Sequence, residues 1–235
     1  MRFTKELRVD ADPIWQAQLA HPFVRGIGDG SLPLEKLDFW VRQDYLFLID
    51  YCRVFALGAA RAPDFQTLTK FADLLHETAH GEMELHRAYA RELGIEPAQL
   101  EAEAAADATR AYADFLIRVA ATGEFAELAA ALLPCMWAFS DIGLALKASS
   151  APTDPRYVRW IEMYADPEFA GLAQWCRRLV DDLAKGAGPE IRDRMREAFL
   201  TSVHYELAFW DMAWKGDGDQ GPGVGDRASE KRAER

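Results

Sequence analysis

The apolar residues of this chain recur at spacings of three and four along most of its length, and almost no stretch alternates with the two-residue period of a strand. Such spacing places apolar side chains along one face of a helix that packs on a core. About seven helices joined by short loops predict an all-α fold, a helical bundle in a single domain. The expected helices cover residues 34–60, 64–93, 97–122, 157–164, 167–185 and 190–214, with one more around Cys135 and a first one starting at Trp15.

Glycine and proline mark the expected breaks between these helices. The first helix should end by Arg25 and give way to the glycine-rich loop GIGDGSLP. Residues 149–155 and 186–189 read as further loops. The pattern stops near the C-terminus, where the sequence becomes rich in glycine and charge. We therefore expect residues 1–214 to form the helical domain and residues 215–235 to form a disordered tail.

The most apolar run of the chain is LAAALLPCMWAFSDIG, residues 128–143, with a proline and a cysteine at its centre. Pro134 cannot donate a backbone hydrogen bond to the carbonyl of Ala130, which favours a kink beside Cys135. A free cysteine in such a run is usually a small, inert core residue. Beside a kink it could also be a nucleophile in a pocket. Taken alone, the run favours the inert interpretation.

Composition narrows the classes of function. The chain has 235 residues, of which 50% are hydrophobic, and its formal net charge is −11 without a basic cluster. Such a charge disfavours binding to nucleic acids or to anionic membranes. The longest uninterrupted apolar run, residues 128–139, is shorter than the roughly 20 residues that a membrane span needs, and the N-terminus lacks the apolar core of a signal peptide. Three cysteines without CxxC spacing fit a reducing compartment. We expect a soluble cytoplasmic protein.

A literal HExxH motif, His76 to His80, matches the pattern of zinc proteases. In a regular helix, His80 would lie on a charged stripe that faces solvent, and no third ligand follows. We therefore expect no metal site here. Glu82 and His86 share the apolar stripe of the same helix, and we expect them to form a buried ion pair that braces two helices.

Three different helices each carry an ionisable group on an otherwise apolar face: Asp44, Cys135 and Glu206. Tyr112 and Tyr164 add phenol groups. A thiolate can add to an electron-poor carbon, and a carboxyl group whose pKa is raised by burial can protonate a ring nitrogen. A second carboxylate can accept hydrogen bonds from an amino group, and aromatic walls can hold a flat ring. This set of groups suits nucleophilic aromatic chemistry on an aminopyrimidine.

Four segments of the chain, in order, resemble the TenA or thiaminase II family: HPFVRGIGDGSLPLEKLDFWVRQDY, HGEMELHRAY, ALLPCMWAFSDIG and YELAFWDMAW. The resemblance covers nearly all of residues 10–214. It implies a heme-oxygenase-like helical fold, a homotetramer, and hydrolysis of thiamin breakdown products to hydroxymethylpyrimidine without a cofactor. The implied substrate of the branch with a catalytic cysteine is an aminomethyl-aminopyrimidine, with thiamin hydrolysed more slowly.

The resemblance also implies roles for individual residues. Cys135 would be the nucleophile and Glu206 the acid/base. Asp44 would bind the amino group of the pyrimidine, Tyr164 would line the site, and Tyr112 would tune the thiol.

Two positions that contribute to the substrate-binding wall depart from the family pattern. The family commonly has tyrosine where this chain has Phe47 and Phe139. Both residues keep an aromatic wall and lose a hydroxyl. Two alternatives stay open: a metal-dependent oxidase or oxygenase of the same fold, and a protein that binds a pyrimidine without converting it.

Overall fold

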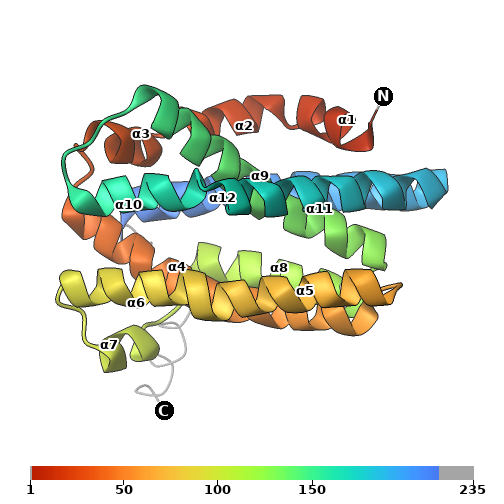
Figure 1. Cartoon of the computed structure of the whole chain (residues 1–235), viewed down its shortest axis with the longest axis horizontal. Coiled ribbons are helices and arrows are strands. Elements are labelled where there is room, and N and C mark those ends of the chain that lie inside the picture. Colours follow the sequence, from red (N-terminus) through yellow and green to blue (C-terminus); the bar gives the residue numbers. More distant parts are fainter. Residues whose placement is uncertain (1, 217–235) are drawn as a thin grey trace, which may run out of the picture.

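The computed structural model describes residues 2–216, and within this range the chain is helical and contains no strand. Figure 1 shows long helices running side by side along the long axis of the bundle. The all-α prediction is therefore confirmed for the described residues. The helices are α1 (Phe3–Asp10), α2 (Asp12–Leu19), α3 (Pro22–Asp29), α4 (Leu34–Arg61), α5 (Phe65–Glu77), the π-helix η1 (Thr78–Glu82), α6 (Met83–Glu92), α7 (Pro97–Ala102), α8 (Asp107–Thr122), α9 (Phe125–Ser149), α10 (Pro155–Tyr164), α11 (Pro167–Gly186) and α12 (Pro189–Lys215).

The most apolar helix, α9, is the centre of the bundle. It packs on α12 and α11 along much of its length and also contacts α10, α8 and α4. Pro134 lies inside this helix without ending it. By length and composition α9 could cross a membrane, yet 78% of its most apolar window is buried inside the bundle. Its apolar character is thus explained by burial on several sides, as in the core helix of a helical bundle.

The segment predicted as one helix over residues 64–93 is helical throughout, but it is not one regular α-helix. Asp64 caps its start by accepting a 2.8 Å hydrogen bond from the backbone N–H of Thr67. After α5, the five residues of η1 are wound as a π-helix, and α6 continues to Glu92. A π-helical turn holds one residue more than an α-helical turn, so side chains after it face directions that a regular period does not predict.

The helix predicted over residues 97–122 is broken, and this prediction is wrong. Glu103 has extended backbone angles after α7, and α8 begins only at Asp107. The side chain of Gln43, from α4, occupies the break: it donates to the carbonyl of Ala104 and accepts from the N–H of Ala106 and the hydroxyl of Thr109. A buried amide of another helix thus satisfies the backbone groups that a helical turn would have paired.

The N-terminal region is more helical than its glycines suggest. Residues 3–10 form α1, which the apolar pattern did not predict, and the segment GIGD belongs to α3 rather than to a loop. A Cβ atom on Gly28 would lie 2.7 Å from the Ser150 Oγ atom, so this glycine permits close helix packing. Gly30, with φ of 77°, ends α3. With twelve α-helices in the described range, the predicted number of about seven was too low.

The helix predicted over residues 190–214 corresponds to α12. The last helix continues one residue beyond Trp214, to Lys215. The remainder of the predicted tail, residues 217–235, lies outside the described residues.

Candidate active site

The seven residues expected to form the site come from five helices that surround one region of the core. Six of the seven side chains are buried, whereas Cys135 is half-buried although its helix is the centre of the bundle. They are Asp44 and Phe47 on α4, Tyr112 on α8, Cys135 and Phe139 on α9, Tyr164 on α10, and Glu206 on α12.

Glu206 and Tyr112 form the shortest polar contact in this region. The Tyr112 hydroxyl donates to Glu206 Oε1 over 2.6 Å and lies 2.8 Å from the Ser202 hydroxyl, one helical turn before Glu206. Burial raises the pKa of Glu206 to about 8, and the nearby Asp44 contributes, while the Tyr112 hydroxyl acts against this shift. Glu206 is therefore a carboxylic acid that still holds its proton near neutral pH.

The Cys135 thiol lies next to Glu206. Burial raises the pKa of this thiol well above its ordinary value, and the carboxyl groups of Glu206, Glu82 and Asp44 add to the effect when they are ionised. The Tyr51 hydroxyl, which donates to the carbonyl of Leu132 over 3.3 Å, is also near the thiol and favours the thiolate. The resting protein thus holds a neutral thiol, which must lose its proton when it adds to a substrate.

Asp44 is paired with His86, which corrects the expected Glu82–His86 ion pair. The Nε2 atom of His86 lies 2.7 Å from Asp44 Oδ2, off the direction of the ring N–H bond, and Nδ1 lies 2.9 Å from the backbone carbonyl of Glu82. Burial alone would lower the pKa of His86, but Asp44 and Glu82 together raise it above its ordinary value. The Glu82 side chain instead accepts a 3.0 Å hydrogen bond from the Tyr164 hydroxyl.

The regular helical period explains why that pairing was mispredicted. Glu82 is the last residue of η1, so residues before and after it do not follow one continuous stripe. Glu82 is half-buried and faces the tyrosine of α10, whereas His86 is fully buried against α4.

Aromatic rings form the walls of the site. Phe47 stacks on Tyr112, with ring centroids 4.9 Å apart, and on Tyr51, at 5.3 Å. Phe139 lies 4.8 Å from the ring of Tyr164 and 5.1 Å from that of Trp210. These are ordinary distances for aromatic contacts, so the two phenylalanines complete the walls without the hydroxyls of tyrosine.

Close packing of α9 and α10 sets the position of Tyr164. A Cβ atom on Gly143 would lie 2.4 Å from the backbone carbonyl carbon of Tyr164. Only glycine lets the two helices approach this closely.

Two neighbours of the site, Tyr51 and Ser202, were not singled out from the sequence. Each lies four residues from a predicted site residue on the same helix, after Phe47 and before Glu206 respectively. Helical spacing could have indicated both, because residues four apart share a face.

The HExxH motif lies outside this region. His76, Glu77 and His80 are exposed, and the two imidazole rings are 4.6 Å apart. Among residues 2–216, no group of three or more His, Cys, Asp or Glu side chains is arranged to hold a metal ion. The ligand set required by a metal-dependent oxidase is therefore not found in the described part of the chain.

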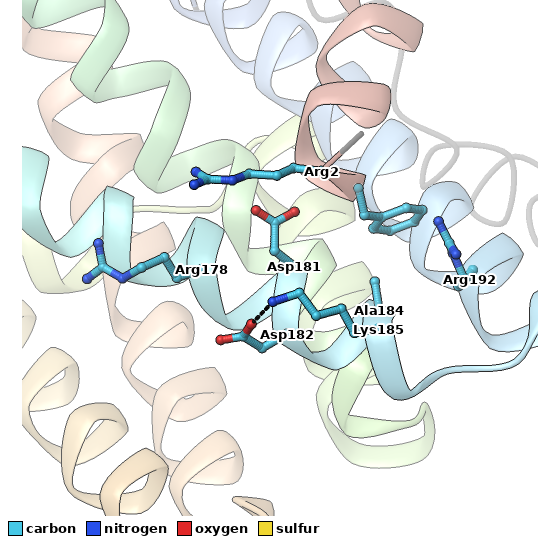
Figure 2. Close-up of a pocket in the computed structure, with 8 residues that line it drawn as sticks. Arg2, Arg178, Asp181, Asp182, Ala184, Lys185 and Arg192 are labelled. Carbon is cyan, nitrogen blue, oxygen red and sulfur yellow. Dashed lines mark hydrogen bonds and ion pairs between the residues drawn. The ribbon is translucent and has the colours of Figure 1, made fainter.

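A surface pocket of about 370 Å³ lies elsewhere, between the start of α1, α11 and the start of α12 (Figure 2). Two of its acidic side chains already have partners. Asp181 accepts hydrogen bonds from the N–H and hydroxyl of Thr4, and Lys185 pairs with Asp182 at 2.7 Å. Asp181 thereby attaches the start of α1 to α11.

The chain is similar to known proteins over most of its length. The TENA/THI-4/PQQC family matches residues 8–216. An aminopyrimidine aminohydrolase from Halalkalibacterium halodurans is 46% identical over 91% of this chain and 96% of its own length, and one from Bacillus subtilis is 35% identical over 93% and 92%.

Solved structures of similar fold are also found. A TenA family transcription regulator from Silicibacter sp. superposes with a TM-score of 0.85 at 28% identity, covering 92% of this chain and 97% of its own. A protein with a heme oxygenase-like fold from Shewanella denitrificans, at 16% identity and a TM-score of 0.72, covers 90% of this chain and 92% of its own and shares the fold. Because the family model spans most of the chain and the relatives are similar over nearly their whole length, the chain belongs to the TENA/THI-4/PQQC family.

Proposed function

We propose that this protein is an aminopyrimidine aminohydrolase of thiamin salvage, which converts aminomethyl-aminopyrimidine, and thiamin more slowly, to hydroxymethylpyrimidine. The observation that carries the proposal is the half-buried Cys135 thiol beside the buried carboxyl group of Glu206. The names of relatives that cover nearly the whole chain support the same reaction. A protein that only binds a pyrimidine would need neither group.

Glu206 exchanges protons with both the ring and Cys135. The carboxylic acid of Glu206 protonates a ring nitrogen, which makes the neighbouring ring carbon more electrophilic. The Cys135 sulfur adds to that carbon, and the thiol proton passes to the Glu206 carboxylate just formed. The raised pKa values of both groups fit this order, because neither has to be ionised before the substrate arrives.

Other residues orient the substrate. Asp44, held by His86, accepts hydrogen bonds from the amino group of the pyrimidine. Phe47 and Phe139 stack against the flat ring, and Tyr112 keeps Glu206 in position. A carboxylate on one side and aromatic faces on the others would select a flat, amino-substituted heterocycle.

The decisive experiment incubates the protein with aminomethyl-aminopyrimidine or thiamin and measures hydroxymethylpyrimidine. Cys135→Ser should keep the fold and some ligand affinity but lose most of the hydrolysis, because serine lacks an accessible anionic form. Cys52→Ser and Cys176→Ser are the matched controls, and each should have only a mild effect on hydrolysis. Full activity of Cys135→Ser would refute the mechanism, and absence of product from the wild-type protein would refute the function.

We also propose that the protein works as a homotetramer, as its resemblance to the family implies, and in the cytoplasm, as its three cysteines without CxxC spacing indicate. The chain has a mass of 26.4 kDa. Light scattering on a sizing column should give about four times this mass, and a monomeric mass would contradict the proposal.

A further inference from the structure

Glu82 is a third carboxyl group of the site that the proposed mechanism does not use. One of its oxygens accepts the hydrogen bond of the Tyr164 hydroxyl, and its charge influences the Cys135 thiol second only to Glu206. Burial and the nearby Asp44 raise the pKa of Glu82 to about 7, while His86 and Tyr164 favour its ionised form. A group with this pKa can take up and release a proton near neutral pH.

The contacts of Glu82 connect it to the aromatic wall of the site. Phe139 is one helical turn after Cys135 and packs on the ring of Tyr164, whose hydroxyl binds Glu82. Glu206 is held in the same way by Tyr112. The buried Glu206 and the half-buried Glu82, each held by a tyrosine from a different helix, thus both influence the Cys135 thiol.

The hydrolysis needs two such groups. Once Cys135 has added to the ring, Glu206 again carries a proton, which it must return to the sulfur when the thiol leaves. It cannot also accept a proton from water. Asp44 is paired with His86 and is assigned to the ring amino group, so Glu82 is the carboxylate left for this step.

We propose that Glu82 is the general base that takes the proton of the water molecule replacing the departing amine. The inference rests on the proposed function. In the covalent adduct the protonated aminomethyl group leaves as ammonia, and its bonding electron pair departs with the nitrogen. The ring electrons stabilise the exocyclic methylene carbon that remains. The water oxygen then bonds to this carbon while one water proton passes to Glu82.

The last step restores the site. The carbon–sulfur bond breaks, the sulfur takes the proton of Glu206, and the ring N–H returns a proton to Glu206. Glu82 finally releases its proton to solvent. Each turnover therefore consumes one substrate cation and one water, and yields the alcohol, ammonia and one proton.

In the test, Glu82→Gln is mixed rapidly with aminomethyl-aminopyrimidine, and the release of ammonia and the formation of hydroxymethylpyrimidine are followed separately. We expect a burst of one ammonia per site, a pyrimidinylmethyl adduct on Cys135 detectable by mass spectrometry, and steady-state turnover at least about 100-fold slower. Azide needs no base, so it should discharge the adduct as the azidomethyl product and raise turnover at least about tenfold.

The controls make each outcome decisive. Glu77→Gln, an exposed glutamate five residues earlier, should behave as the wild-type protein does. Glu82→Ala, which leaves space for azide, serves if Glu82→Gln does not fold. Slow turnover of Glu82→Gln with neither a burst of ammonia nor rescue by azide would show that Glu82 is only a structural partner of Tyr164, and would overturn the inference. Unchanged turnover of Glu82→Gln would overturn it too. A wild-type protein that releases no ammonia would instead refute the proposed function.

Discussion

Replacing Glu206 by glutamine should stabilise the protein while it removes the catalytic acid. The carboxyl group is buried, and its pKa is raised to about 8 from an ordinary value of 4.5. Between these values the folded protein binds a proton that the unfolded chain has already released, so the wild-type protein loses stability as the pH rises. Glutamine has nearly the same shape, does not titrate, and can still accept the hydrogen bond of Tyr112.

The size of this effect follows from the two pKa values. At pH 7 the solution is about 2.5 pH units above the ordinary pKa, and each unit corresponds to about 1.4 kcal/mol. Keeping Glu206 neutral in the folded state therefore costs about 3 kcal/mol in free energy of unfolding at pH 7. At pH 4.5 the cost is only a few tenths of a kcal/mol, because the unfolded chain also holds much of the proton.

Urea unfolding at pH 4.5 and pH 7, monitored by far-ultraviolet circular dichroism, measures the difference in free energy of unfolding between Glu206→Gln and the wild-type protein. Glu206→Gln should gain about 3 kcal/mol over the wild-type protein at pH 7 and almost nothing at pH 4.5, while its turnover falls at least about 100-fold. Glu197→Gln, an exposed glutamate on the same helix, should show no gain at either pH. A gain that does not depend on pH, or a loss at pH 7, would refute the view that Glu206 is a costly buried acid.

Three further variants test the walls and the surroundings of the site. Phe139→Tyr should raise kcat/KM about 2–10-fold by adding one hydrogen bond, and slower turnover of both substrates would show a pocket shaped for phenylalanine. His76→Ala combined with His80→Ala should leave turnover unchanged with or without chelator; loss of stoichiometric zinc along with activity would contradict this. Gly143→Ala should cost about 1–3 kcal/mol of stability and weaken substrate binding by displacing Tyr164, as thermal unfolding and KM can show.

Much of the fold could be predicted from the sequence because most helices carry a regular apolar stripe. The start of α4 and the ends of α8 and α10 agree with the prediction to within a residue, since proline, glycine and the last apolar residues mark them. The break before α8 could not be predicted in this way. It depends on Gln43, a residue more than fifty positions earlier that pairs with the backbone there.

The sequence pattern indicated which ionisable residues would be buried, because Asp44 and Glu206 each stand on an apolar helix face. Both are buried and near the thiol, although their roles stay predictions. The partner of Asp44 was missed, because the turn that carries Glu82 is not α-helical and the sequence gives no signal of this. The resemblance to the family supplied the nucleophile, since Cys135 alone reads as an inert core residue.

The π-helical turn from Thr78 to Glu82 also affects how this region can tolerate changes in length. It is equivalent to an α-helix with one inserted residue. The side chains of α6 are therefore rotated about the helix axis relative to those that a regular continuation of α5 would give. A one-residue deletion at Gly81, an exposed position, could be absorbed by rewinding the turn as α-helix, so the helix need not break. Such a shortened chain would keep α5 packed on α4 but rotate Glu82 or His86 away from its partner. Folding and assembly of the site are therefore separable at this single turn.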